Sequence, residues 1–340
     1  MQAQLYHIED ADTDRNKIIQ AAEVIKNGGT VIFPTETVYG LGANGLDTDA
    51  AKKIYEAKGR PSDNPLILHV SDYEMLKSVV SDFPKKAEKL AESFWPGPLT
   101  MILYKAKIVP DTVTGGLNTV AVRMPSNPIA QALIKESGVP IAAPSANISG
   151  RPSITDWEFA VDEMKDRVDV ILLSEPSKIG LESTIIDLSV ETPVILRPGF
   201  IGQSEIESKI GKIVLSSGQV SSEDVPKAPG MKYTHYSPRA EVYIAPKNTP
   251  VEKIIEFYNK NKEKNPVIFV LRRYINNFYG CAIHDMGENT VDAAKVFFRA
   301  LRQADKAERE CIIICDMAYD EMGSALMNRA FKAAGGKIIE

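Results

Sequence analysis

The sequence predicts an α/β protein of two domains that are joined by a linker. Helical and strand-like segments alternate over the first 200 residues, and the alternation resumes after residue 240. The chain has 340 residues, which is more than one domain usually contains. Turn-forming Ser, Gly and Pro are frequent between the two regions. We therefore place domains at residues 1–205 and 240–340, with a linker or lid over 206–239.

Apolar periodicity predicts the elements of the first domain. Residues 16–27 have apolar side chains at helical spacing and end at Gly28, which suits a helix terminus. Helices are predicted at 16–27, 48–58, 84–94 and 127–137. Short apolar runs predict strands at 30–34, 66–70, 99–105, 120–124, 140–143, 168–173, 183–188 and 194–196. This mixture predicts a helix-covered sheet, α/β or α+β, whose strand order the sequence leaves open.

The second domain has the order β-α-β-α-β-α. Its strands are predicted at 241–245, 267–271 and 311–315, and its helices at 251–261, 291–304 and 321–334. This order over about 100 residues is typical of a small Rossmann-like domain. The domain lacks a glycine-rich phosphate-binding signature, so its role does not follow from its sequence.

Composition narrows the classes of function. The net charge of -5 argues against a protein that coats nucleic acid, although a local basic cleft is compatible with it. Three cysteines, Cys281, Cys311 and Cys315, and an N-terminus without an apolar signal core indicate a reducing compartment, so we expect a cytoplasmic protein. Cys311 and Cys315 flank an apolar run and are expected to be core residues rather than a metal or redox pair. No apolar segment has the length of a membrane span.

The segment KGRPSDNP, residues 58–65, combines two cations with a stiff backbone. A helix cannot continue through Gly59-Arg60-Pro61, because proline lacks a donor and disfavours helical geometry at the preceding residue. Lys58 and Arg60 therefore lie on a constrained loop, where they suit a phosphate-rich ligand. Considered alone, the two cations are better explained as solvated side chains at a helix C-terminus, where cations are common.

Glycines at positions 40, 42 and 45 match the dinucleotide pattern G-x-G-x-x-G. The preceding strand ends too early for the usual tight turn, and no acidic residue ends the next strand, where His69 stands. We expect these glycines to permit a close approach of the backbone to a ligand or a neighbouring segment.

Other predicted strand ends also carry polar side chains, as do ligand sites of open α/β sheets. These groups are Thr35-Glu36-Thr37, Arg123, Ser145-Ala146-Asn147, Glu182-Ser183-Thr184 and Arg197. Cations, hydroxyls and an amide suit a nucleotide and a small polar acid. The scarcity of general acids points to catalysis by positioning and charge neutralisation.

Several of these segments together resemble one family. The strings GGTVIFPTETVYGLGA, KGRPSDNPLILHV, WPGPLT, VAVRMP, PIAAPSAN, ESTIIDL and LRPG look like those of the threonylcarbamoyl-AMP synthases, which are YrdC-like proteins. They extend over most of residues 15–200 in the family's order. APGMKYTHYSP, at 228–238, resembles the linker of the long form, which carries a C-terminal domain. The resemblance implies a YrdC-like twisted mixed sheet for the first domain.

The resemblance also implies an activity and partners. L-Threonine, bicarbonate or CO2 and ATP would give threonylcarbamoyl-AMP and pyrophosphate, with magnesium bound through the ATP phosphates rather than by a protein metal site. A separate transferase complex would then modify tRNA next to the anticodon. Direct tRNA binding is compatible with this function but not required by it.

Site residues follow from the resemblance position by position. The catalytic tetrad falls on Lys58, Arg60, Ser145 and Asn147. ATP contacts would add Ser62, Thr119, Ala143, Ser153, Arg197 and Tyr236, and threonine contacts would be Thr35, His69, Arg123 and Ser183. Pro229 and Gly230 make the linker a candidate lid that excludes water from the carbamate.

Two alternatives remain at this point. An RNA-binding module could use the same basic cleft, but the net charge and the lack of interleaved aromatic and basic residues count against it. A carbamoyl-adenylate enzyme of hydrogenase maturation shares the YrdC-like domain but adds cysteine-rich domains, which this chain lacks.

Overall fold

The protein is described by a computed structural model over residues 2–216, 226–228 and 236–340. Pro229 and Gly230, on which the lid hypothesis rests, lie outside the described residues. Among the described residues, every helix is too short or too polar to cross a bilayer.

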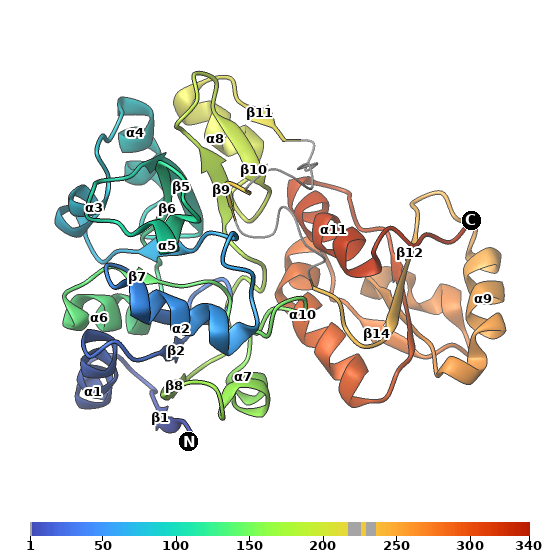
Figure 1. Ribbon diagram of the computed structural model, residues 1–340. Coiled ribbons are helices and arrows are strands. Elements are labelled where there is room, and N and C mark those ends of the chain that lie inside the picture. The colour runs from blue at the N-terminus through green and yellow to red at the C-terminus, as the bar shows by residue number, and fades with distance from the viewer. Residues whose placement is uncertain (1, 217–225, 229–235) are drawn as a thin grey trace. The chain divides into compact units, whose positions relative to one another are not determined.

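The chain forms two compact units (Figure 1). The first contains the described residues up to 149, with 154–178 and 182–228. The second contains residues 236–340 and two loops of the N-terminal half, 150–153 and 179–181.

A large mixed sheet forms the centre of the first unit. Its described strands have the order β1-β8-β2-β3-β7-β4-β6-β5-β9-β10-β11. Their bounds are β1 Gln4–His7, β2 Val31–Phe33, β3 Gly40–Asn44, β4 Ile67–His69, β5 Leu99–Tyr104, β6 Thr119–Arg123, β7 Ile141–Ala142, β8 Val170–Leu173, β9 Thr184–Asp187, β10 Val194–Arg197 and β11 Val214–Leu215. Parallel and antiparallel neighbours are both present, so the expected twisted mixed sheet with covering helices is confirmed.

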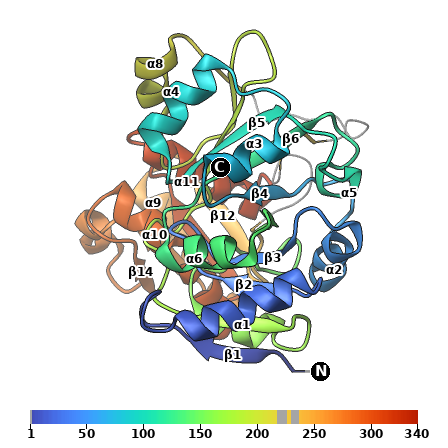
Figure 2. The same cartoon turned by 90° about the vertical axis from the view of Figure 1, so that its left-hand side faces the viewer.

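Helices cover this sheet. They are α1 Arg15–Lys26, α2 Thr48–Lys58, α3 Tyr73–Val79, α4 Lys85–Phe94, α5 Asp111–Thr114, α6 Pro128–Ser137, α7 Trp157–Met164 and α8 Gln203–Ile210. Figure 2 shows α1 and α6 side by side. Both helices pack on Val31 and Phe33 of β2, whereas Ile32 belongs to the core that α2 and α4 cover. This alternation follows from the period of two along a strand, which sends successive side chains to opposite faces.

The second unit is a small parallel α/β domain. Its described strands, β12 Glu241–Ala245, β13 Val267–Val270, β14 Ile283–Asp285 and β15 Cys311–Cys315, are in the order β12-β15-β13-β14. Helices α9 Val251–Lys260, α10 Thr290–Lys306 and α11 Glu321–Ala334 and two 3-10 segments, η1 Lys262–Lys264 and η2 Arg272–Phe278, complete it. Parallel pairing throughout confirms the expected small Rossmann-like domain. Burial raises the pKa of the Cys311 thiol to about 11, so this thiol stays protonated in the core.

Most elements with regular apolar spacing lie where they are predicted. Elements without such spacing, such as β3, are not predicted. Strand β3 was interpreted as a glycine loop, because Gly40-Leu-Gly-Ala-Asn44 has low strand propensity. Its Gly42 packs so closely on Phe33 and Ile141 that a β-carbon would lie 2.7 Å and 2.5 Å from their side chains. The glycines therefore serve close backbone packing and not a dinucleotide.

The expected end of the first domain needs a correction. The boundary between residues 205 and 206 falls inside α8, and β11 adds to the first sheet by pairing with β10. Ile206 and Ile213 belong to the core of the first unit. The linker is predicted to start too early because α8 and β11 are short and have weak apolar patterns, and a serine-rich stretch follows them directly.

Candidate active site

Lys58 joins helix α2 to the loop that follows β7. It is the last residue of α2, which Gly59 ends in the left-handed conformation at φ 59°. Its Nζ donates to the carbonyl oxygen of Ser145 at 2.5 Å and to that of Asn147. Ser145 Oγ in turn donates to Asn147 Oδ1 at 2.6 Å. Three members of the predicted tetrad therefore lie together.

Arg60, the fourth member, is held on its own loop. Its Nε donates to the carbonyl oxygen of Asn64 at 3.3 Å and its Nη2 to that of Pro65 at 3.1 Å. Lys58 is 1% exposed and Arg60 9%. The interpretation of both as exposed loop cations is therefore wrong, because their own segment and the Ser145 loop cover them. Ser62 is exposed beside them.

The strands β4, β6, β5 and β9 present one common face to the predicted site. The side chains of Ile67, Ile102, Ala121 and Ile185 share this face and form a small apolar cluster. We call it the site face. Because side chains alternate along a strand, the same face receives predicted site residues of these strands and their ends. They are His69, Thr119, Arg123 and Ser183.

His69 and Arg123 are direct neighbours across the parallel pair β4 and β6. Burial, and then the charge of Arg123, lower the pKa of His69 to about 3, so the imidazole is neutral at physiological pH. Its Nδ1 lies 3.2 Å from the carbonyl oxygen of Ile67, to which the Nδ1–H tautomer donates. Thr119 starts the strand that Arg123 ends, about 13 Å away along β6.

The loop after β2 meets Arg123 over this face. Arg123 Nη1 donates to Thr37 Oγ1 at 2.9 Å, and Nη2 forms an ion pair with Glu36 Oε1 at 2.6 Å. Thr35 Oγ1 lies 2.9 Å from Thr37 Oγ1. Burial raises the pKa of the Glu36 carboxyl, but Arg123 and the backbone N–H groups of Glu36 and Ser126 together lower it by more, so the pair is ionised.

Ser183 lies beside Arg197, so a predicted threonine residue and a predicted ATP residue are in contact. Arg197 Nη2 donates to Ser183 Oγ at 3.1 Å and Nε to the Ser183 carbonyl oxygen at 3.0 Å. Thr100 Oγ1 lies 2.7 Å from Ser183 Oγ. Ala143, also predicted for ATP, is buried just after β7, and its N–H donates to Ile67.

Part of the linker lies on the site face. Ala228 is buried in the apolar cluster with Ile67 and Ile185. The neighbouring Lys227 pairs with Asp187 at 2.8 Å. This fragment, residues 226–228, is one of three described pieces of the predicted linker or lid, with 206–216 and 236–239.

Two predicted ATP residues, Ser153 and Tyr236, belong to the second unit. Ser153 is fully buried, and its carbonyl oxygen accepts from Arg302 Nε at 3.2 Å. Tyr236 has a positive φ of 68° and packs on Phe298 with ring centroids 5.1 Å apart. Both contacts are therefore made within the second unit.

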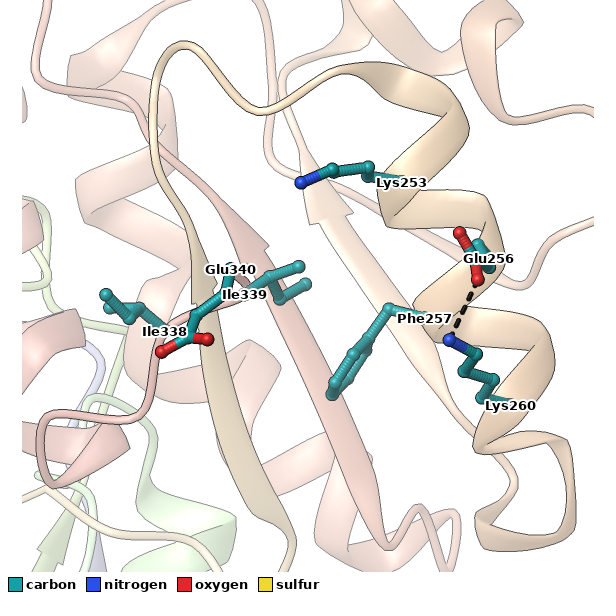
Figure 3. A pocket seen from close by; sticks show the side chains of 7 residues that line it. All are labelled: Lys253, Glu256, Phe257, Lys260, Ile338, Ile339 and Glu340. Carbon is teal, nitrogen blue, oxygen red and sulfur yellow. Dashed lines mark ion pairs between the residues drawn. The ribbon is translucent and has the colours of Figure 1, made fainter.

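Two open hollows are lined by none of the four tetrad residues. A cleft of about 620 Å³ near α2 and α5 is lined by Ser62 among the predicted residues. A hollow of about 360 Å³ in the second unit lies between α9 and the segment 338–340 (Figure 3). Lys253 and Lys260 are matched there by Glu256 and Glu340, so the hollow has no clear charge preference.

The residue-by-residue assignment omits Glu36 and Thr37, which the strand-end pattern includes, and Thr100, which no sequence argument includes. All three are buried polar residues that contact a predicted threonine-site residue. Their signal was present in the strings PTETVYG and WPGPLT, where polar side chains interrupt buried segments. Buried polar groups that need partners are candidates for a ligand site.

The fold and this site define an α/β enzyme of the Sua5, YciO and YrdC class. The family profile of that class, described as "Telomere recombination", matches residues 23–199. A second profile, described as "Threonylcarbamoyl-AMP synthase, C-terminal domain", matches residues 201–335. The chain therefore belongs to the threonylcarbamoyl-AMP synthase family, in the form with the additional C-terminal domain.

Relatives in this family are similar over nearly the whole chain. The threonylcarbamoyl-AMP synthase of Pyrococcus abyssi is 45% identical over 95% of this chain and 96% of its own. That of Bacillus subtilis is 42% identical over 97% of this chain and 96% of its own. The crystal structure of P. abyssi Sua5 complexed with L-threonine matches with a TM-score of 0.91 at 42% identity, over 100% of this chain and 99% of that one.

Proposed function

We propose that this enzyme makes threonylcarbamoyl-AMP and pyrophosphate from L-threonine, bicarbonate or CO2 and ATP. The observation that carries the proposal is the pairing of two buried cationic centres in one unit. Lys58 with Ser145 and Asn147 forms one centre, and Arg123 with the hydroxyls of the β2 loop forms the other. The first suits phosphates and the second an amino-acid carboxylate.

The chemistry requires positioning more than acid–base catalysis. The threonine amine combines with CO2 to a carbamate and loses a proton, or combines with bicarbonate and loses water. A carbamate oxygen then attacks the α-phosphorus, and pyrophosphate leaves. Both reactants are anionic, so Lys58 and Arg60 would offset their repulsion and the charge that grows on the leaving group.

Magnesium would be bound through the phosphates of ATP. Among the described residues, no three His, Cys, Asp or Glu side chains form a metal-binding group. Mg²⁺ keeps several of its water ligands and binds substrate phosphates more readily than a cage of protein groups. The ion would supply further neutralisation of phosphate charge.

The linker acts as a lid in this proposal. The placement of Ala228 on the site face supports it, because an apolar residue there excludes water. Exclusion of water matters since carbamates hydrolyse readily, and lid closure is a common means of achieving it. Tyr236, near the end of the linker, would close over the nucleotide.

The cellular setting is part of the proposal. We propose a cytoplasmic enzyme whose product goes to a separate transferase that modifies tRNA next to the anticodon. The acyl-adenylate is reactive and must be consumed by an acyl transfer.

One assay tests the proposed function. Purified protein with ATP, magnesium and bicarbonate should release pyrophosphate only when L-threonine is present. Mass spectrometry of the quenched reaction should detect threonylcarbamoyl-AMP. Release that does not depend on threonine, or a different adenylate, would refute the proposal.

A further inference from the structure

Glu36 is a buried acid that the tetrad and the predicted ligand contacts leave without a role. It lies between Thr35 and Thr37 on the loop after β2. Its side chain is 7% exposed and that of its partner Arg123 5%. The two charges are 2.6 Å apart, between Glu36 Oε1 and Arg123 Nη2.

The pair retains free capacity for hydrogen bonds. Arg123 donates from Nε to the Gly97 carbonyl oxygen at 3.3 Å and from Nη1 to Thr37. Neither Nη2 nor either oxygen of Glu36 completes a hydrogen bond within the described part of the chain, although all three atoms are buried. The N–H groups of Glu36 and Ser126 lower the pKa of the carboxyl without reaching normal hydrogen-bond geometry.

Stability does not account for such a pair. Transferring two ions from water into the protein interior often costs more free energy than their attraction contributes. Apolar residues of similar size often stabilise a core as well or better. Buried polar atoms without hydrogen bonds add to that cost. Here a cation and an anion lie side by side, and each has atoms that can form further hydrogen bonds. Such a pair is complementary to a ligand that has both a negative and a positive group.

We propose that Arg123 and Glu36 form a receptor for the zwitterionic head group of an α-amino acid. Arg123 takes the carboxylate, and Glu36 accepts hydrogen bonds from the α-ammonium group. This inference rests on the proposed function, since it names how the amino-acid substrate is recognised. It assigns to Glu36 a role in specificity.

The residues around the pair support the assignment of the carboxylate to Arg123 and of the ammonium group to Glu36. His69, opposite Arg123, is neutral and adds no competing charge. The low pKa of Glu36 keeps it ionised, so it can accept hydrogen bonds from the bound ammonium group, which releases its proton to solvent before the amine reacts. Thr37 and Gly97 hold the guanidinium in one orientation. Hydroxy acids and amino alcohols, which each lack one charge, would leave one member of the pair unmatched.

The unaltered protein provides the first test. Titration calorimetry would compare L-threonine with threoninol, which lacks the carboxylate, and with the dihydroxybutanoate isostere, in which a hydroxyl replaces the ammonium. We expect each analogue to bind at least about tenfold more weakly, the scale of a lost hydrogen bond to a charged group. Binding of the isostere within about threefold of threonine would overturn the proposal.

Glu36→Gln provides the second test. It should weaken threonine binding at least about tenfold and leave ATP binding unchanged, so the preference for threonine over the isostere should shrink. Glu36→Asp, which keeps the charge, should restore part of the preference. Glu136→Gln is the matched control, because Glu136 pairs with Arg15 at 2.7 Å on the surface. An unchanged preference in folded Glu36→Gln would overturn the proposal.

The outcomes separate this inference from the proposed function. If Glu36→Gln does not fold, the ligand series on the unaltered protein and Glu36→Asp decide the question. Threonine-dependent pyrophosphate release with an isostere that binds as well as threonine would refute the receptor alone. Charge-selective threonine binding without threonine-dependent release would refute the proposed function alone.

Discussion

The Nζ of Lys58 donates to the carbonyl oxygen of Ser145 at 2.5 Å, so one buried cation connects the end of helix α2 to the loop after β7. The bond aligns an ammonium with two backbone carbonyls and leaves it 1% exposed. Lys58 is therefore expected to contribute both to the stability of the fold and to activity, and the two contributions can be measured separately.

Lys58→Ala should lower both activity and stability. Activity should fall at least about tenfold because a phosphate-neutralising charge is lost. The free energy of unfolding should fall by about 1–3 kcal/mol because two buried carbonyls lose their donor. Pyrophosphate release and urea unfolding measure the two effects. Lys52→Ala is the control, since Lys52 is exposed on the same helix and should change neither. Unchanged stability would mean that water replaces the ammonium.

Ser183→Ala should reduce discrimination by the substrate hydroxyl. The Ser183 hydroxyl is buried between Arg197 and Thr100, and a site that bonds a hydroxyl rejects analogues that lack it. The ratio of kcat/KM for threonine over α-aminobutyrate should fall at least about tenfold, mainly through KM for the amino acid. Ser208→Ala, on exposed α8, is the control. A uniform fall in kcat for both substrates would point to a structural role.

His69 should make the protein sensitive to acid. Its folded pKa of about 3 lies below the ordinary value of 6.5, so the unfolded chain binds the extra proton between these pH values. Stability is therefore present above pH 6.5 and is lost as the pH falls toward 3, by up to about 1.4 kcal/mol per unit.

Urea unfolding between pH 7 and pH 4 would measure this slope, and His69→Gln should flatten it. His7→Gln, at an exposed position on β1, should leave it as it is. If the stability of His69→Gln falls with pH as steeply as that of the unaltered protein, groups other than His69 cause the pH dependence.

Ala228→Glu should release the lid from the site face. A glutamate cannot stay buried against Ile67 and Ile185 without a partner, so the segment would leave that face. We expect a several-fold loss of threonylcarbamoyl-AMP per ATP consumed, measured by mass spectrometry, because water gains access. Ala318→Glu, the same substitution at an exposed alanine, is the matched control. An equal product yield in both variants would contradict the lid.

Local signals determined the regular elements of this protein. Helix α2 ends at Lys58 as predicted, because apolar spacing and Gly59 act over a few neighbouring residues. Strands β12 and β15 and helix α11 also begin and end where predicted, since an uninterrupted apolar pattern leaves little choice. The motif strings were likewise sufficient to indicate the family.

Only the tertiary structure decided the strand order and the burial of the charges. β4 lies between β7 and β6, which places His69 beside Arg123 although the two residues are 54 positions apart in the sequence. The β2 loop crosses to Arg123 and brings Glu36 with it, and nothing local to Glu36 predicts that partner. Pairing between distant strands depends on the packing of the whole sheet, so a charge that looks solvated in the sequence can lie buried in the fold.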